Sequence, residues 1–440
     1  MTGPMTSAGQ MSQQTSPPDK HSHQMSGEGR VVREPGEQDS GVSVFGLADL
    51  LWPHPAVVTL ERAGGQAEPA VAQYIPLPSA TDPRLLLPRR PRRAAAAAIR
   101  HQPAAPGKAR LRRDIGALGI AGGLGDFAQR HHIRVVAGAP VGGAAETVET
   151  FFSRRLGREV LLSMHLGKPR ANRKPVVQIL TPTGTTLGFA KIGVDALTNS
   201  LVRAETSALH LIAAAHLRQV TTAEVLFSDC WNDLDIVMTS PLPVWGRRRA
   251  VPADVLLAAT QEVAAVAPAS TLTLRDWMGT SGLLDRLAGL APGEAASDLR
   301  SAAADLVAAA GHIRLDCGAW HGDWTPWNMA AVADRLFVWD WERFAAPVPK
   351  GFDALHHSLQ QALVSERRPA RAATEALTRG APATLAPYDV PPDIAPVVVL
   401  AYLTELAGRY LHDGQEAAGA RLGRVGEWLV PVLATLAADL

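Results

Sequence analysis

Short apolar runs bounded by proline, glycine or aspartate predict β-strands in the first half of this 440-residue chain. The clearest are residues 160–166, 176–180 and 187–192, and two more follow at 224–227 and 234–238. Shorter runs of the same kind precede them, at residues 57–60, 71–77 and 85–87. The strand-rich part of the chain is therefore predicted to end near residue 240.

Apolar residues spaced three and four apart predict helices further along the chain. The first helix is predicted to begin near Asn199 or Ser200, because either side chain is a good N-cap. One face of this helix comprises Val202, Glu205, Leu209 and Ile212, at offsets of 0, 3, 7 and 10. A carboxylate on an apolar face is costly without a cationic partner, so Glu205 is predicted to have one.

Helical spacing dominates the second half of the chain. It relates Leu299, Ala303, Leu306, Ala310 and Ile313, and it continues from Asp353 to the end. At the other end, residues 1–40 are rich in Ser, Gln, Gly and Pro, which predicts a disordered tail. The predicted organisation is this tail, a small α/β module at 41–144, a sheet-containing region at 145–240 and a helical region at 241–440.

Composition excludes several classes of protein. The chain is 47% hydrophobic, as globular proteins are, and 43 basic against 42 acidic residues give a net charge of +1. This balance provides no electrostatic reason for a nucleic-acid or membrane partner. There is no apolar run of about 18 residues, no signal-peptide pattern, and only two cysteines, Cys230 and Cys317. We therefore expect a cytoplasmic protein without a disulfide framework.

Arginines are concentrated in residues 89–113. One interpretation is a contact with phosphate or nucleic acid. The other is a solvated face, or salt bridges to the neighbouring domain. The second is favoured because the segment has no interleaved aromatic residues and the whole chain is nearly neutral.

The most informative stretch reads WHGDWTPWN at residues 320–328. It places a carboxylate, Asp323, five residues before a carboxamide, Asn328, and a second carboxylate, Asp340, follows a short apolar strand. Mg²⁺ prefers such hard oxygen ligands, with phosphate and water oxygens completing its coordination. A remaining free aspartate can accept the proton of a substrate hydroxyl.

These residues resemble the motifs of the aminoglycoside phosphotransferase and choline kinase family, which are small-molecule kinases. The catalytic loop of that family reads His-Gly-Asp with Asn five residues later, and its metal-binding strand ends in Asp, often as Asp-Trp-Glu. Both patterns occur here, at residues 321–328 and 340–342. The resemblance covers about two-thirds of the chain. It implies an α+β, two-lobed protein-kinase-like fold, with a small antiparallel-sheet N-lobe at 145–240 and a mainly helical C-lobe at 241–440, after a small N-terminal module.

The resemblance also implies a role for each motif residue. Asp323 would be the catalytic base or would orient the acceptor hydroxyl, and Asn328 and Asp340 would hold Mg²⁺ ions that bridge the ATP phosphates. His321 would be structural within the loop, and Glu342 would support the loop rather than touch substrate.

Kinase chemistry also requires a lysine on a strand to neutralise the α- and β-phosphates, held by a glutamate from the following helix. Lys191 lies inside an apolar strand, and Glu205 follows 14 residues later. Residues 240–243 would form the hinge, where the backbone at Ser240 and Leu242 would bind the adenine edge. The loop at 167–175 has one glycine and four cations. Those cations could contact ATP phosphates, bind an anionic substrate, or be solvated.

The implied function is ATP- and Mg²⁺-dependent phosphorylation of a hydroxyl group on a small molecule. A catalytically degenerate kinase fold that only binds nucleotide, or regulates, is the alternative. The substrate stays open among antibiotics, sugars, amino alcohols and biosynthetic intermediates. A cationic aminoglycoside or choline would favour clustered carboxylates in the C-terminal helices, but the carboxylates there are no denser than on an ordinary surface: Asp353, Glu366, Glu375 and Asp389. The adjacent pairs His131-His132 and His356-His357 do not form metal sites by themselves. The sequence does not determine the oligomeric state.

Overall fold

The computed structural model describes residues 44–62, 70–101, 108–123, 131–137, 146–167, 171–245, 249–438 and 440. The tail predicted at 1–40 lies outside these ranges. All described residues belong to one structural unit.

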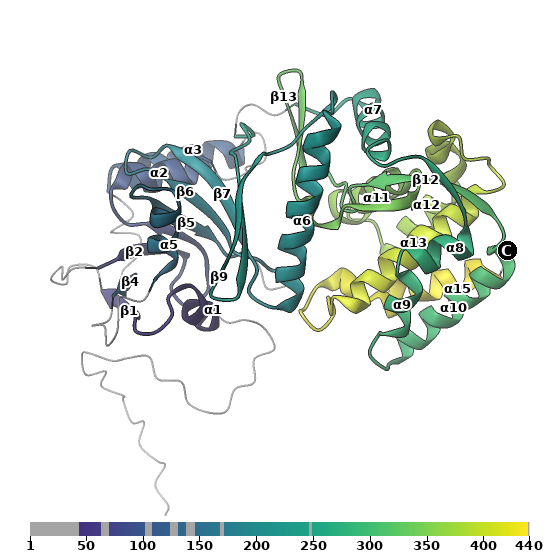
Figure 1. Cartoon of the computed structure of the whole chain (residues 1–440), viewed down its shortest axis with the longest axis horizontal. Helices are drawn as coiled ribbons and strands as arrows, with labels where there is room; N and C mark the ends of the chain where they lie inside the picture. The colour runs from purple at the N-terminus through teal and green to yellow at the C-terminus, as the bar shows by residue number, and fades with distance from the viewer. Residues whose placement is uncertain are drawn as a thin grey trace, which may run out of the picture. The chain divides into compact units, whose positions relative to one another are not determined.

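A nine-stranded antiparallel sheet organises the first half of the described chain (Figure 1). Its strand order is β1-β4-β2-β3-β5-β6-β7-β10-β9. In chain order the strands are β1 (Val57–Arg62), β2 (Ala72–Pro78), β3 (Pro83–Pro88), β4 (His131–Val136), β5 (Leu161–His165), β6 (Val176–Leu180), β7 (Thr186–Ile192), β9 (Val225–Trp231) and β10 (Leu234–Thr239). Every strand predicted between residues 57 and 238 lies in this sheet, and β4 is the one strand of the sheet that was not predicted.

The sheet crosses the predicted boundary between residues 144 and 145. β3 pairs antiparallel with β5, with Leu86 opposite Met164. This pairing joins β1–β4 to the five later strands, so β5 has no free edge. The small sheet predicted for residues 145–240 is therefore extended by strands of the N-terminal module.

Helices cover both faces of the sheet. Consecutive residues of a strand point to opposite faces, so Leu86 and Leu87 of β3 belong to different apolar cores. Leu86 packs in the core that includes residues of α1 and α5, whereas Leu87 packs with the small residues of α2. The helices of this part are α1 (Val44–Leu51), α2 (Arg92–Arg100), α3 (Lys108–Ala121) and α5 (Val148–Arg155).

The long helix α6 (Ala196–Ala215) begins one turn earlier than predicted. Asp195 is its N-cap, because its carboxylate accepts the backbone N–H of Thr198 at 2.7 Å. Asn199 instead uses its side chain to bond the backbone of Asp233 and Asp235 in the β9–β10 hairpin. The predicted apolar face is confirmed, since Val202, Glu205, Leu209 and Ile212 are all buried.

The second half of the described chain is mainly helical, as predicted. Its helices are α7 (Ala253–Ala264), α8 (Leu274–Thr280), α9 (Leu283–Ala288), α10 (Glu294–Ala310), α11 (Phe352–Gln360), α12 (Ala370–Leu385), α13 (Ala395–His412), α14 (Val425–Trp428) and α15 (Val430–Ala438), with shorter helical turns at Trp341–Arg343, Gln361–Ser365, Ala386–Tyr388 and Arg421–Gly423. Two three-stranded sheets accompany these helices. Their strands are β11 (Ser270–Thr273), β12 (Arg314–Trp320) and β15 (Ala345–Pro349) in one, and β8 (Val220–Thr221), β13 (Met329–Val332) and β14 (Arg335–Val338) in the other.

These elements confirm the predicted α+β fold class, with an antiparallel sheet followed by a helical part. Strand β12 leads into the loop that contains the His-Gly-Asp motif, and β14 leads to Asp340. Within the described ranges, none of the helices combines the length and the hydrophobicity that a membrane span requires.

Candidate active site

Lys191 and Glu205 form a largely buried ion pair, as the sequence predicted. Lys191 lies on the interior strand β7, opposite Val176 of β6 and Val237 of β10. Its Nζ atom donates to both carboxylate oxygens of Glu205 on α6, each at 2.7 Å. Burial raises the pKa of Glu205, the charges of Asp340 and Glu342 add to this effect, and Lys191 partly offsets it. Each residue thus supplies the charge that the other needs.

Asp340 joins this pair from a position 149 residues along the chain, where its Oδ1 accepts a hydrogen bond from Lys191 Nζ. Asp340 comes two residues after β14 and has a left-handed backbone, with φ 70° and ψ 51°. An aspartate in this conformation is strained, and such residues concentrate at functional sites. Burial would lower the pKa of Lys191, but Asp340 and Glu205 raise it above its ordinary value.

Asp323 is held by two side-chain donors. Asn328 Nδ2 donates to its Oδ2 at 2.8 Å, and His356 Nε2 contacts its Oδ1 at 3.1 Å. Burial lowers the pKa of His356, so its ring is neutral at pH 7. Because the Asp323 carboxylate only accepts, His356 carries its proton on Nε2, and its Nδ1 accepts from Tyr402, 3.0 Å away. These bonds fix the orientation of the carboxylate.

Asp323 is ionised in this setting. Burial would raise its pKa, but the hydrogen bond from His356 and the charge of Arg409 lower it below its ordinary value. The Arg409 guanidinium also donates from Nη1 to the Gly322 carbonyl at 2.7 Å. Asp323 is therefore an oriented proton acceptor that is partly open to solvent, with 37% of its side chain exposed.

The loop before Asp323 is shaped by Gly322 and His321. Gly322 has φ +83°, and a Cβ there would lie 2.1 Å from the Arg343 carbonyl oxygen, so only glycine fits. Burial lowers the pKa of His321 to about 4, and the neutral ring bridges the Asp323 backbone N–H and the Trp339 carbonyl. This geometry agrees with the structural role expected for His321.

Asp353 anchors the same loop, although the sequence suggested an ordinary surface carboxylate. That interpretation is wrong, because Asp353 is only 5% exposed on α11. Its two oxygens accept the backbone N–H groups of His321 at 2.7 Å and Gly322 at 3.1 Å. These bonds favour the ionised form, but burial opposes it more strongly and raises the pKa of Asp353 to about 7.

Asp353 should therefore make activity depend on pH near neutrality. Below about pH 7 the carboxyl gains a proton, which removes one acceptor and loosens the loop, so kcat should fall on this side of the profile. Asp353→Asn should lower kcat at high pH and abolish this acidic limb. The measurement is kcat against pH for both proteins. The same limb in both would assign it to another group.

Stability should respond in the opposite direction. A carboxyl whose pKa is higher in the folded than in the unfolded chain binds its proton more tightly when folded. Its contribution to the free energy of unfolding therefore falls as pH rises from about 4 to about 7. Urea unfolding of the two proteins should show the wild type gaining stability relative to Asp353→Asn as the pH is lowered.

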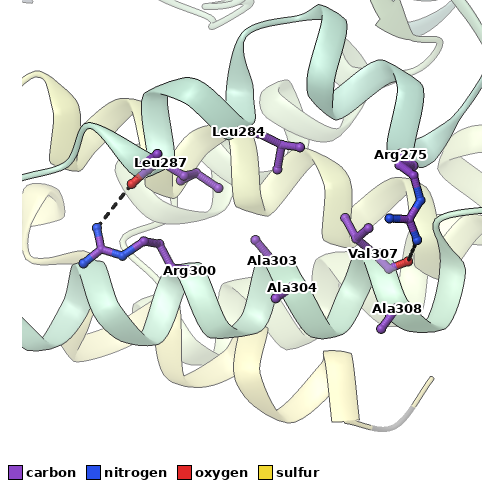
Figure 2. Close-up of a pocket in the computed structure, with 9 residues that line it drawn as sticks. Arg275, Leu284, Leu287, Arg300, Ala303, Ala304, Val307 and Ala308 are labelled. Atoms are coloured by element: carbon purple, nitrogen blue, oxygen red, sulfur yellow. Dashed lines mark hydrogen bonds between the residues drawn. The ribbon is translucent and has the colours of Figure 1, made fainter.

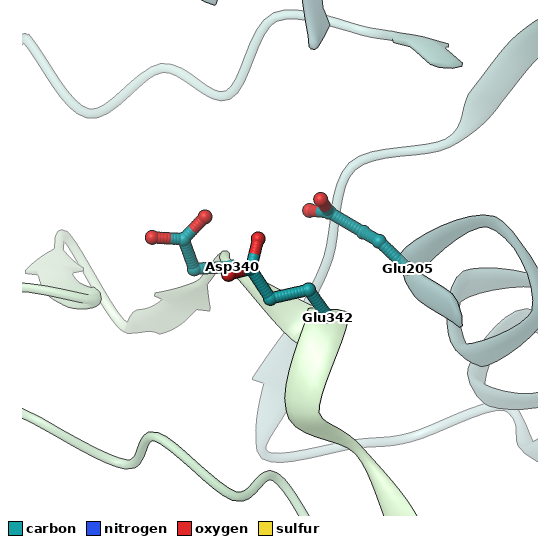
Figure 3. A group of neighbouring side chains, drawn as sticks. All are labelled: Glu205, Asp340 and Glu342. Carbon is teal, nitrogen blue, oxygen red and sulfur yellow. The ribbon is translucent and has the colours of Figure 1, made fainter. Parts of the chain in front are cut away.

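Asp340, Glu342 and Glu205 gather three carboxylates in one place (Figure 3). Oxygen atoms of all three lie within 4.8 Å of one another. Asn328, the other predicted metal ligand, is attached to this region because its carbonyl accepts the Trp339 N–H at 3.1 Å. Its Nδ2 is used by Asp323, which leaves its side-chain oxygen without a donor among the described residues. A carboxylate and an amide oxygen are ligands that fit Mg²⁺.

The predicted hinge follows β10 directly, at the strand that pairs with the Lys191 strand. Ser240 is bonded to Glu224 through both its N–H, at 2.8 Å, and its Oγ, at 2.9 Å. The Leu242 carbonyl accepts from Val244. Among the described contacts, the Ser240 carbonyl and the Leu242 N–H have no partner. The backbone at these two positions can therefore offer one acceptor and one donor to a ligand.

The cationic loop at 167–175 is described only in part, because residues 168–170 lie outside the described ranges. Lys174 forms an ion pair with Glu342 at 2.7 Å, and both side chains are less than one-tenth exposed. Arg173 Nε donates to the Leu166 carbonyl at 2.5 Å. Two of the four cations in this loop are thus engaged within the protein. The basic segment at 89–113 behaves similarly where it is described, since Arg93 donates to the Pro182 carbonyl.

A cavity that is separate from these residues lies among α8, α9 and α10 (Figure 2). Its volume is about 420 Å³, and its wall is mostly leucine, valine and alanine. Its two arginines, Arg275 and Arg300, donate to the backbone carbonyls of Val307 and Leu287. None of the described residues that line this cavity is a carboxylate or a histidine, so these residues include no group suited to moving a proton. The residues with acid–base chemistry converge around Asp323 instead.

Sequence reasoning missed four residues of the site: Lys174, Asp353, His356 and Arg409. For two of them a signal existed. Asp353 and His356 are three residues apart on a helical face whose other members, Phe352, Leu355 and Leu359, are apolar and buried. Like Glu205, they are polar groups on an apolar face. Lys174 and Arg409 carry no comparable local signal.

No protein-family model matches the sequence, and no curated protein matches it. Solved structures do match. A thermostable mutant of aminoglycoside phosphotransferase APH(4)-Ia, in a ternary complex with AMP-PNP and hygromycin B, shares 13% identity over 67% of this chain and 100% of that one, with a TM-score of 0.44. Choline kinase LicA from Streptococcus pneumoniae shares 15% identity over 66% of this chain and 99% of that one, with a TM-score of 0.42. Amicoumacin kinase hAmiN, in complex with AMP-PNP, Ca²⁺ and Ami, shares 11% identity over 60% and 85%, with a TM-score of 0.38. These are distant likenesses, and each is to a small-molecule kinase.

Proposed function

We propose that the chain is an ATP- and Mg²⁺-dependent phosphotransferase that phosphorylates a hydroxyl group of a small molecule. The observation that carries the proposal is the convergence of Lys191, Glu205 and Asp340 beside the loop that holds Asp323 and Asn328. These five residues come from two segments that are far apart in the chain, residues 191–205 and 323–340. Each has the side chain that phosphoryl transfer requires at its position.

The nucleotide would be held from two sides. The Ser240 carbonyl and the Leu242 N–H are suited to the adenine edge, and Lys191 is suited to the α- and β-phosphates, with Glu205 fixing its position. Asn328 and Asp340 would hold Mg²⁺, which, when bound, neutralises charge on the phosphates. The backbone strain at Asp340 is consistent with a side chain placed for a ligand.

Asp323 would act on the acceptor hydroxyl. The hydroxyl oxygen forms a bond to the γ-phosphorus as the bond from that phosphorus to the ADP oxygen breaks, and the hydroxyl proton passes to the Asp323 carboxylate. In a loose transition state, most of the rate enhancement from such an aspartate comes from orienting the hydroxyl. His356 and Asn328 hold the carboxylate in one orientation for this purpose.

An ATP-consumption screen tests the proposal. Aminoglycosides, macrolides, choline, sugars and amino alcohols are offered with ATP and Mg²⁺, and ADP is measured. We expect ADP release that depends on one acceptor class, stops with EDTA and is absent from Asp340→Ala. Asp334→Ala is the matched control, because Asp334 is an exposed aspartate in the turn before β14. ATP binding without transfer to any acceptor would instead favour the catalytically degenerate alternative.

A further inference from the structure

A small polar cavity lies beside Asp323. Its volume is about 210 Å³, and its wall comes from the loop of Asp323, the turn at Trp341–Arg343, α11, the end of α13 and the segment up to Gly423. Pockets for drug-sized ligands occupy about 300–1,000 Å³, so this cavity is small. It is called the acceptor cavity below. It has room for a single ring beside the carboxylate.

The charges in the wall of the acceptor cavity are balanced. Glu342 is paired with Lys174 at 2.7 Å, and Asp413 is paired with Arg343. These four side chains are at most 17% exposed, so each pair is largely withdrawn from solvent. Neither carboxylate is left as a free anion to attract a cationic substrate.

The third carboxylate, Asp323, lies in the field of Arg409. Arg409 is buried, and among the described residues it forms no direct ion pair; its guanidinium donates a hydrogen bond to the Gly322 carbonyl. Its charge acts on Asp323 electrostatically. Among the described residues, the three carboxylates of the wall thus have three cations near them, two in the wall and Lys174 behind Glu342, and an added charge on a substrate would have no dedicated partner.

The rest of the wall suits hydroxyl groups. Asn172, Gln360, Tyr410 and Gln415 are uncharged and can both donate and accept hydrogen bonds. Gln360 Nε2 and Tyr410 Oη are 3.3 Å apart, so the two groups already share a bond at the wall. Hydroxyl groups of a ring also both donate and accept, which matches this mixed lining.

Trp327 supplies a flat apolar surface at the same cavity. Three other tryptophans near this loop, Trp320, Trp324 and Trp341, are buried in the core, whereas Trp327 is 41% exposed and lines the cavity. Exposing the apolar surface of an indole to water is unfavourable, and a ligand that covers the ring removes this cost in free energy. The apolar face of a sugar or cyclitol ring fits such a surface, with its hydroxyl groups at the edge.

We infer that the acceptor is a small uncharged polyol ring, a monosaccharide or cyclitol, that stacks on Trp327 and presents a hydroxyl to Asp323. This inference rests on the proposed phosphotransferase function. It excludes polycationic aminoglycosides, choline and sugar acids as preferred acceptors. Three observations support the inference: the charges in the wall are balanced, the other polar side chains are neutral, and the Trp327 indole is exposed.

Ring acceptors of similar size that carry no charge, a positive charge or a negative charge test the inference. Glucose, glucosamine, glucuronate and myo-inositol are compared by kcat/KM with ATP and Mg²⁺, and choline and an aminoglycoside are included. We expect a neutral ring to exceed every charged acceptor by about tenfold or more. Preference for a charged acceptor would overturn the inference and leave the proposed function intact. No transfer to any acceptor, including a broader hydroxyl library, would overturn both.

Trp327 gives a second, independent readout. Trp327→Ala should raise KM for the neutral acceptor about tenfold with kcat and the KM for ATP little changed, and Trp327→Phe should recover part of this loss. Circular dichroism and unfolding curves establish that both variants fold. A fall in kcat with KM unchanged, or equal KM values for alanine and phenylalanine, would count against stacking of the ring on Trp327.

Discussion

Asp323→Asn is expected to lower kcat by about three orders of magnitude while ATP affinity stays nearly constant. Asparagine has the size of aspartate but cannot take the hydroxyl proton. Its amide also cannot accept from both neighbours, because His356 and Asn328 each donate to one carboxylate oxygen in the wild type. The amide NH₂ of the asparagine would then face one of these two donors, which should lower the free energy of unfolding by about 1–3 kcal/mol.

The two effects are separated by measuring both. kcat comes from steady-state ADP release, ATP affinity from calorimetry, and the free energy of unfolding from urea titration. Asp334→Asn is the matched control, since this exposed aspartate lies on the β13–β14 turn of the same region. A kcat within tenfold of the wild type would remove Asp323 as the group that handles the hydroxyl proton.

Local spacing made the centre of the site predictable. Asp323 and Asn328 are five residues apart, and their side chains meet at 2.8 Å within one loop. Lys191 and Glu205 are 14 residues apart, yet each was conspicuous alone, as a charge among apolar neighbours. Two buried charges of opposite sign predict each other, and the structure joins them at 2.7 Å.

The supporting residues were not predictable in the same way, because long-range packing positions them. Asp353 reaches back 32 residues to the His321 N–H, and Arg409 reaches back 87 residues to the Gly322 carbonyl. Helix packing, rather than any motif, brings α11 and α13 to the loop. Sequence spacing identifies which residues carry out the chemistry more readily than which residues hold them.

The extended sheet shows a similar limit. β4 has two histidines and an arginine among its six residues, so its apolar pattern is weak. His132 and Arg134 are nevertheless buried, and Arg134 pairs with Glu61 of β1 at 2.6 Å. A strand whose buried charge depends on a partner 73 residues away carries no clear sequence signal.

Lys191→Met is expected to lower the free energy of unfolding by about 3–5 kcal/mol and to abolish measurable phosphoryl transfer. Glu205 is 4% exposed, and its other polar neighbours are the carboxylates of Asp340 and Glu342. Without the lysine, three acidic groups remain close together, and among the described residues the one cation paired with them is Lys174, on Glu342. Stability is lost because a buried carboxylate has no partner, and activity because the phosphates lose their cation.

Glu205→Gln in the Lys191→Met background separates these two losses. Removing the glutamate charge should return part of the lost stability, because the uncompensated carboxylate is gone, while activity stays absent. The coupling energy comes from urea unfolding of the wild type, both single variants and the double variant. Additive losses would mean that the 2.7 Å contact contributes nothing to stability. Stability rescue together with restored transfer would mean that Lys191 does not serve the nucleotide, because only its charge balance with Glu205 would then have mattered.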